Sequence, residues 1–157
     1  MERIRALAVL IGAAFMLAAP AHPIVPASPL ESTDLTALRG RVVYLDFWAS
    51  WCAPCRQSFP WMQTLEDAYK GRGLTIIAVN LDRDRSDAES FLKKYQPRFE
   101  VRFDPQGHWA EAFKVQGMPT SVMIDRAGNA RFTHVGFRPA DGSRYVQQIE
   151  QLLAEHP

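Results

Sequence analysis

The feature that most constrains this fold is a pair of cysteines placed shortly after a run of apolar residues. Residues 42–47 read Val-Val-Tyr-Leu-Asp-Phe, and Cys52-Ala53-Pro54-Cys55 follows after four more residues. A nearly continuous apolar run is typical of a strand buried on both faces of a sheet. Where a strand passes into a helix, free backbone N–H groups and the helix dipole favour a thiolate at the first sulfur. The pattern therefore predicts a redox-active dithiol at a strand-to-helix junction.

The number of cysteines argues against a disulfide-stapled scaffold. The chain has only two cysteines among 157 residues, 47% of its residues are apolar, and its formal net charge is +1. A stapled secreted protein uses several pairs around a small core, whereas this chain is long enough for one domain with a sizeable core. A ring of so few residues also restricts the unfolded chain little. The near-neutral charge disfavours nucleic acid as a partner.

The N-terminal residues have the pattern of an export signal. Arg3 and Arg5 precede an apolar stretch at residues 6–19, and Ala19-Pro20-Ala21 resembles a cleavage site. About 14 apolar residues are short for a membrane-spanning helix, which needs roughly 20. We therefore expect a signal peptide at residues 1–21, with an uncleaved anchor as the alternative. An extended leader at residues 22–33 and one folded domain at residues 34–157 follow.

The remaining patterns predict strands that alternate with helices. Pro60 is expected to kink the helix that follows the cysteines, and Ser86 with Glu89 to form a capping box at the start of the next. This order predicts an α/β domain with a mostly parallel sheet, one antiparallel edge and helices on both faces. Strands are expected at residues 42–47, 74–81, 99–103, 120–124 and 130–135, and helices at 34–38, from the cysteines to 70, 86–95, 109–113 and 139–154.

Two separated motifs resemble those of the thioredoxin superfamily. Residues 46–55 read Asp-Phe-Trp-Ala-Ser-Trp-Cys-Ala-Pro-Cys, and residues 117–120 read Gly-Met-Pro-Thr. The helix and strand expected between residues 86 and 103 form an insert that plain thioredoxins lack. With the export signal, this insert resembles the TlpA/ResA-like periplasmic thiol–disulfide oxidoreductases. The resemblance implies a thioredoxin fold with an inserted helix–strand unit, located in the periplasm or, with a retained anchor, on the periplasmic face of the inner membrane.

The resemblance also implies roles for the motif residues. Cys52, partly exposed, is the expected nucleophile, and Cys55 is the expected resolving thiol that releases the substrate. Pro119 matches the family's cis-proline, and the backbone of Met118 is expected to pair with the substrate as an added strand. The substrate is further expected to contact Trp51, Ala53 and Pro54, while Trp48 is expected to pack in the core.

Asp46 is the one charged residue in the first apolar run. A buried charge is costly unless it is paired or functional, and the resemblance places this carboxyl beneath the disulfide. Burial raises the pKa of a carboxyl, so Asp46 is a candidate base that deprotonates Cys55 through water. The alternatives are an outward-facing aspartate at the strand end and a buried one satisfied by a hydroxyl.

Some features depart from the family pattern. Ser58 stands three residues after Cys55, where several ResA-like and cytochrome-maturation proteins carry a glutamate, so specificity for that pathway is not assumed. The segment before residue 41 is short for the N-terminal hairpin of this group.

The other charged and histidine residues suggest no further site. The charged residues 82–85 are expected to form a solvated loop. The four histidines show no ligand spacing to the cysteines, and no metal site is expected.

Function is therefore expected to be exported thiol–disulfide exchange, most simply disulfide reduction in periplasmic proteins. No cofactor is needed because the two sulfurs carry the electrons, and a membrane electron donor is expected to recycle a monomeric protein. The direction, reductase or oxidant, is not fixed by Ala53-Pro54. The alternative is a copper(I) metallochaperone that uses both thiols with Met118 as a soft neighbour. A peroxiredoxin-type peroxidase is a weaker alternative, because those enzymes use an isolated cysteine.

Overall fold

The computed structural model describes residue 33 and residues 35–155, so the expected signal peptide and most of the leader lie outside the described residues. Five strands form one mixed sheet in the order β3-β2-β1-β4-β5. The central β1 is parallel to β2, which is parallel to β3, while the β4–β5 hairpin joins the other side through antiparallel pairings. The strands are β1 (Val42–Trp48), β2 (Leu74–Asn80), β3 (Glu100–Phe103), β4 (Thr120–Ile124) and β5 (Ala130–Val135).

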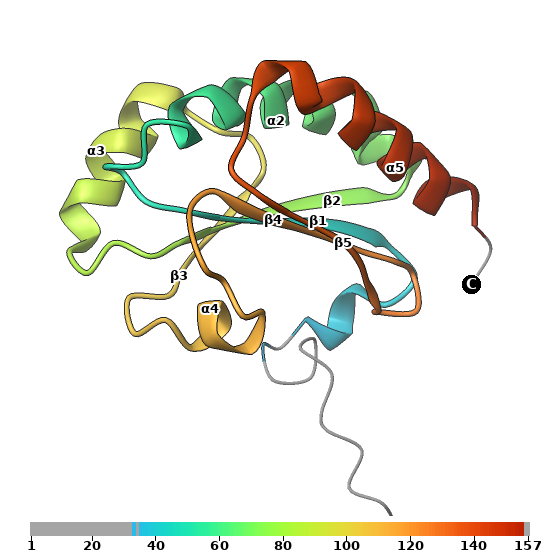
Figure 1. Ribbon diagram of the computed structural model, residues 1–157, viewed down its shortest axis with the longest axis horizontal. Coiled ribbons are helices and arrows are strands. Elements are labelled where there is room, and N and C mark those ends of the chain that lie inside the picture. The colour runs from blue at the N-terminus through green and yellow to red at the C-terminus, as the bar shows by residue number, and fades with distance from the viewer. Residues whose placement is uncertain (1–32, 34, 156–157) are drawn as a thin grey trace, which may run out of the picture.

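Helices cover both faces of this sheet, as the element order predicted. Figure 1 shows the longer helices over one face of the sheet and a short helix under the other, together with the first short 3-10 helix. The upper helices are α2 (Cys55–Tyr69), α3 (Arg85–Tyr95) and α5 (Gly142–Ala154), and the lower one is α4 (His108–Ala112). The 3-10 helices are η1 (Thr36–Leu38), η2 (Lys70–Arg72) and η3 (Pro139–Asp141).

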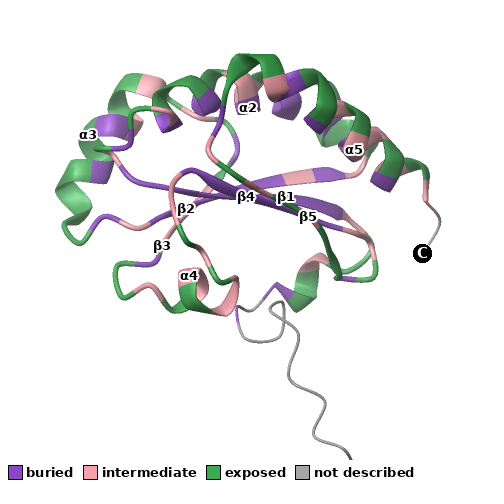
Figure 2. Cartoon of the chain, in the orientation of Figure 1, coloured by how far each residue is buried: buried purple, intermediate pink, exposed green. Residues whose placement is uncertain are grey.

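The sheet divides the apolar core into two layers because alternate side chains of each strand point to opposite faces. All seven residues of β1 are buried, which is what its nearly continuous apolar pattern predicted. Tyr44 and Trp48 belong to the layer under α2, α3 and α5, whereas Leu45 and Phe47 belong to the layer over α4. The burial colours in Figure 2 follow the same division, with buried central strands and helices that expose their outer faces.

Aromatic packing attaches the inserted α3–β3 unit to the helix that follows the cysteines. The Phe91 ring of α3 lies 4.8 Å from Phe59 of α2 and 4.7 Å from Trp48 of β1, measured between ring centroids. Tyr95 stacks on Phe91 at 4.3 Å, and Phe99 lies 5.5 Å from Phe59. The insert therefore shares the main core instead of forming a separate appendage.

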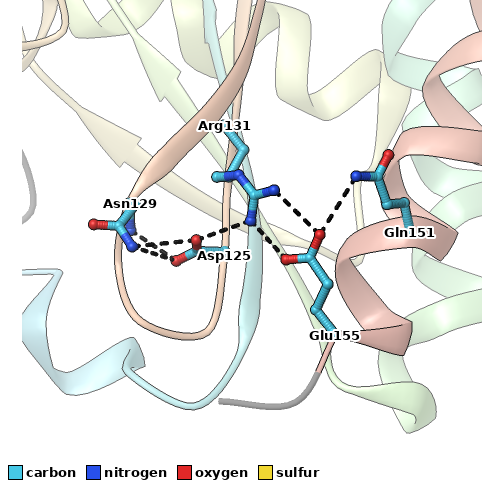
Figure 3. Close-up of polar contacts among 5 residues, drawn as sticks. All are labelled: Asp125, Asn129, Arg131, Gln151 and Glu155. Atoms are coloured by element: carbon cyan, nitrogen blue, oxygen red, sulfur yellow. Dashed lines mark hydrogen bonds and ion pairs between the residues drawn. The ribbon is translucent and has the colours of Figure 1, made fainter.

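An ion-pair network ties the β4–β5 hairpin to the C-terminal end of α5. Arg131 of β5 lies between Asp125 of the hairpin loop and Glu155, with Nη1 3.2 Å from Asp125 Oδ2 and 2.6 Å from Glu155 Oε2 (Figure 3). Asn129 donates a backbone hydrogen bond to Asp125, and Gln151 donates to Glu155. The network fixes the hairpin end that lies away from the cysteines.

Two local predictions need correction. The N-cap of α3 is Asp84 rather than Ser86: its carboxylate accepts hydrogen bonds from the backbone N–H and hydroxyl of Ser86, and the helix begins at Arg85. Glu89 pairs with Arg85 instead of closing a capping box, since a carboxylate already caps the helix. The final helix is divided into η3 and α5, while α2 runs through Pro60 as one helix and its kink stays a prediction.

Candidate active site

The two cysteines form a disulfide at the start of α2. Sγ of Cys52 is bonded to Sγ of Cys55 at 2.05 Å, and the backbone N–H of Cys55 donates to Cys52 Sγ at 3.3 Å. Cys55 is the first residue of α2, and Pro54 is its N-cap. A helix N-terminus offers unpaired N–H groups and positive potential, which together stabilise a thiolate on Cys52 after reduction.

Cys52 is less exposed than the resemblance implied. Cys52 is 3% exposed and Cys55 is fully buried, whereas the flanking Trp51 is 67% exposed. Ala53 is also exposed and Pro54 is half-buried, so the rim of the disulfide is formed by the three residues expected to contact substrate.

Asp46 is buried on the face of β1 that lies under α2. It is 1% exposed, lies between Ala78 of β2 and Ser121 of β4, and shares its face with Tyr44 and Trp48. Oδ2 of Asp46 has no hydrogen-bond partner among the described residues. Burial raises the pKa of this carboxyl well above its usual value. The outward-facing alternative is therefore wrong, and the structure provides a buried acid on the face that holds the cysteines.

The loop before β4 contains the second motif. The Met118–Pro119 peptide bond is cis, as the resemblance predicted. The hydroxyl of Thr120 donates to Gly117 O at 2.6 Å, and the backbone N–H of Gly136 donates to Pro119 O at 2.7 Å. These bonds hold the loop between the start of β4 and the residue that follows β5. Met118 stays half-buried against the same core layer as the cysteines.

Two other predicted positions lie in the core. Trp48 is fully buried, as expected for a core residue. Ser58, which stands where relatives carry a glutamate, is also fully buried, and its hydroxyl donates to the carbonyl of Cys55 at 3.2 Å. The site therefore has an uncharged hydroxyl at this position, and Asp46 is a buried carboxyl on the α2 side of β1.

Asp82 is a residue that the sequence analysis missed. The charge run predicts a solvated loop there, but Asp82 is 5% exposed, and its carboxylate accepts hydrogen bonds from the backbone N–H and hydroxyl of Ser50 at 2.9 and 3.0 Å. Asn80 donates a further bond at 2.8 Å. These bonds fix the turn that leads into Cys52. The sequence signal for this role was the spacing Asn80-Leu81-Asp82 at the end of a buried strand. Residues two apart in a strand point to the same side, so the side chains of Asn80 and Asp82 face the same loop.

The described residues contain neither a membrane-spanning helix nor a clustered metal-ligand set. Throughout residues 35–155, no helix is long and apolar enough to cross a bilayer. Within that same part of the chain, no group of three or more His, Cys, Asp and Glu side chains is arranged to hold an ion.

The chain is similar to known thiol–disulfide oxidoreductases over most of its length. The Redoxin family model matches residues 18–153. Thiol-disulfide oxidoreductase ResA of Bacillus thuringiensis subsp. konkukian is 32% identical over 123 residues, which are 78% of this chain and 68% of that relative. ResA of a Bacillus cereus strain is 36% identical over 120 residues, covering 76% and 69% of the two chains.

Solved structures agree with the fold. The crystal structure assigned to thiol:disulfide interchange protein DsbE of Chlorobium tepidum is 52% identical, with a TM-score of 0.75 over 76% of this chain and 85% of that one. StoA of Bacillus subtilis is 26% identical, with a TM-score of 0.61 over 69% and 84%. With the dithiol at the start of α2 and the cis-proline loop, these matches show that the chain belongs to the Redoxin family, as a TlpA/ResA-like thiol–disulfide oxidoreductase of the thioredoxin superfamily.

Proposed function

We propose that this protein is an exported reductase of protein disulfides. The observation that carries the exchange chemistry is the position of Cys52, whose sulfur accepts the backbone N–H of Cys55 at the start of α2. In the reduced protein the Cys52 thiolate attacks one sulfur of a substrate disulfide and releases the other as a thiolate. The thiolate of Cys55 then attacks Cys52 Sγ, which releases the second substrate sulfur. Two electrons pass to the substrate, and the Cys52–Cys55 disulfide forms.

Asp46 is the proposed base for the second step. The Cys55 thiol must lose a proton before it attacks, and Asp46 is a buried carboxyl with a raised pKa on the same side of the sheet. Because burial raises the pKa of Asp46, its carboxylate accepts a proton more readily than that of an ordinary aspartate. Since Ser58 supplies no carboxylate, this role falls on Asp46 alone among the acids considered from the sequence.

Substrate is proposed to bind as an extended chain along the Met118–Pro119 backbone, with Trp51, Ala53 and Pro54 at its side. Trp51 and Val135 are the exposed large apolar side chains of the described structure, and both adjoin this loop or the disulfide. An extended peptide that pairs with a backbone edge gains main-chain hydrogen bonds without needing a particular sequence.

Export, recycling and the lack of a cofactor complete the proposal. The basic and apolar pattern of residues 1–21 supports passage to the periplasm, where protein disulfides are available as substrates. A membrane electron donor would return the disulfide to the dithiol form. The two sulfurs carry both electrons, so no further redox group is required, and the protein is proposed to act as a monomer.

The test is reduction of insulin disulfides together with trapping of the intermediate. The wild-type protein should reduce insulin, the Cys52→Ser variant should be inactive, and the Cys55→Ser variant should accumulate a mixed disulfide through Cys52. Accumulation is measured by non-reducing electrophoresis and mass spectrometry of the adduct. Tight stoichiometric Cu(I) binding that needs both thiols, without insulin reduction, would instead support the metallochaperone alternative and reject this proposal.

A further inference from the structure

A pocket of about 380 Å³ opens beside the disulfide, and none of the roles above uses it. It lies between the end of β5, the loop that follows, and the start of α5. Pro54, which directly precedes Cys55 and caps α2, forms part of its wall. A side chain that enters this pocket therefore belongs to a molecule that lies next to Cys52.

The pocket carries an excess of positive charge. Its charged lining residues are Arg138, Arg144 and Asp141. Asp141 accepts from Arg138 Nε at 3.1 Å and from Arg144 Nη2 at 3.3 Å, and the hydrogen bond from Arg138 together with the charges of both arginines holds the pKa of Asp141 below its usual value. One ionised carboxylate therefore faces two guanidinium groups, which leaves a net charge of about +1 at neutral pH.

The other titratable side chains in the pocket wall, His134 and Tyr145, add no negative charge at neutral pH. His134 lies in the pocket wall, and burial lowers the pKa of its imidazole, so the ring is neutral at pH 7. Its ring stacks on Tyr145 at 4.2 Å, and one ring nitrogen contacts Gln148 Oε1 at 2.7 Å. Burial also raises the pKa of the Tyr145 phenol, which keeps it protonated. The stack forms a fixed wall behind the two arginines.

The arginines keep donors for a second acceptor. In the contacts with Asp141, Arg138 uses Nε alone and Arg144 uses Nη2 alone. The terminal fork of Arg138 and the Nε and Nη1 of Arg144 take no part in those two bonds. A guanidinium presents five N–H donors in a planar fork that matches a carboxylate. The geometry and the charge both suit a carboxylate.

The pocket also lies on the path of the proposed substrate. Gly136, in the pocket wall, donates its backbone N–H to Pro119 O, so the cis-proline loop and the pocket rim are joined directly. Val135 is 65% exposed at this rim and lies against Gly117. A chain that pairs with the Met118–Pro119 backbone therefore passes the mouth of the pocket.

We propose that this pocket is a subsite that binds the carboxylate of an aspartate or glutamate near the reactive cysteine of the client polypeptide. This inference rests on the proposed reductase function and names a preference within its substrates. Clients with an acidic residue at the matching position react faster, and clients with a basic residue there react more slowly.

The test uses the reduced protein and short peptides whose single cysteine is joined to 2-nitro-5-thiobenzoate. Attack by Cys52 transfers the peptide to the protein and releases a coloured thiolate, so the second-order rate constant is read directly. Glutamate, glutamine or lysine is placed in turn at each position flanking the cysteine. Wild-type protein should favour glutamate over lysine by about 1.4- to 5-fold at one or two positions, the range for exposed charge pairs.

Charge reversal separates recognition from stability. In the Arg138→Glu/Arg144→Glu variant the glutamate-to-lysine ratio at those positions should invert, and a general loss of activity cancels from a ratio. The Arg98→Glu/Arg102→Glu variant is the matched control, because it changes the net charge equally and both arginines, paired with Asp67 and Glu100, lie outside the lining of this pocket. It should keep the wild-type ratio. About 1 M NaCl should bring the wild-type ratio near one.

Two results would overturn the subsite. One is a wild-type ratio close to one at every position, and the other is a ratio that charge reversal leaves unchanged. If Cys52 attacks none of the peptides, the reductase proposal fails instead. The subsite is then still decided by the anisotropy of fluorescent peptides carrying serine in place of cysteine, which should bind the oxidised wild-type protein more tightly with glutamate than with lysine.

Discussion

At the scale of single residues, Asp46 combines a stability cost with the role of base proposed above. Its carboxyl is buried, Oδ2 lacks a partner among the described residues, and burial raises its pKa. An acid whose pKa is raised in the folded state binds more protons there than in the unfolded chain. Its favourable contribution to folding is therefore fully present below about pH 3.9, the ordinary value, and is lost as the pH rises through the raised pKa.

The Asp46→Asn variant should show both effects. Its free energy of unfolding should exceed that of the wild type at neutral and higher pH, and the difference should shrink below about pH 3.9. Its resolution of a mixed disulfide at neutral pH should slow by about tenfold or more, since a general base is lost. Denaturant titrations across pH measure the change in stability, and stopped-flow kinetics of mixed-disulfide resolution measure the change in rate.

Asp67→Asn, at an exposed site on α2, is the control and should change neither quantity. An unchanged resolution rate in Asp46→Asn would remove Asp46 from the mechanism.

The role of a single residue could be predicted only where that residue stands out in its local sequence pattern. Asp46 stood out because a charge interrupts an apolar strand, and the two cysteines stood out by spacing. Asp82 looked like one member of a charged run, yet it is buried against Ser50. Its role depends on β1 and β2 ending side by side, and that neighbourhood exists only after the chain has folded. The pocket around Arg138 and Arg144 was missed for the same reason, because β5, α5 and Pro54 meet only in three dimensions.

At the scale of elements, the pattern of apolar residues predicted the strands and the presence of the helices closely. It did not predict where the helices begin. All five strands were predicted within about two residues: β1, β2 and β4 carry the apolar runs of buried strands, whereas β3 and β5 are more exposed and follow from alternation and from the hairpin turn. The start of α3 was wrong because Asp84 and Ser86 are both good capping residues. Which of the two residues caps the helix depends on the path of the chain after β2 ends, and the sequence alone does not determine that path.

The inserted α3–β3 unit should depend on one aromatic side chain. Phe91 of α3 is 7% exposed and contacts Trp48, Phe59 and Tyr95. The Phe91→Ala variant removes a ring from a close-packed cluster, which should reduce the free energy of unfolding by about 3–5 kcal/mol. Chemical denaturation followed by tryptophan fluorescence measures this loss. Phe132→Ala, at the half-buried edge of the same layer, is the control and should cost clearly less. Equal losses would mean that the insert does not depend on Phe91.

At the scale of the whole molecule, the redox state of two cysteines is linked to the stability of the fold. Core layers on both faces of the sheet hold the structure, so the disulfide is not needed as a staple. The ring it closes spans only a sequence separation of three. In the chain-entropy description such a small ring stabilises the folded state by about 1–3 kcal/mol. Both the oxidised and the reduced protein should therefore unfold cooperatively.

The difference between these two stabilities determines the direction of the chemistry. Folding and reduction form a thermodynamic cycle, so a folded couple more reducing than its unfolded counterpart requires the oxidised form to be the more stable one. For two electrons, about 30 mV corresponds to about 1.4 kcal/mol. A reductase should therefore unfold at higher denaturant when oxidised, with a potential nearer about −270 mV than about −120 mV. Paired denaturations with and without dithiothreitol measure the difference, and a Cys52→Ser/Cys55→Ser variant should not respond to the reductant. A reduced form more stable than the oxidised one would mean that Cys52 and Cys55 act as an oxidant.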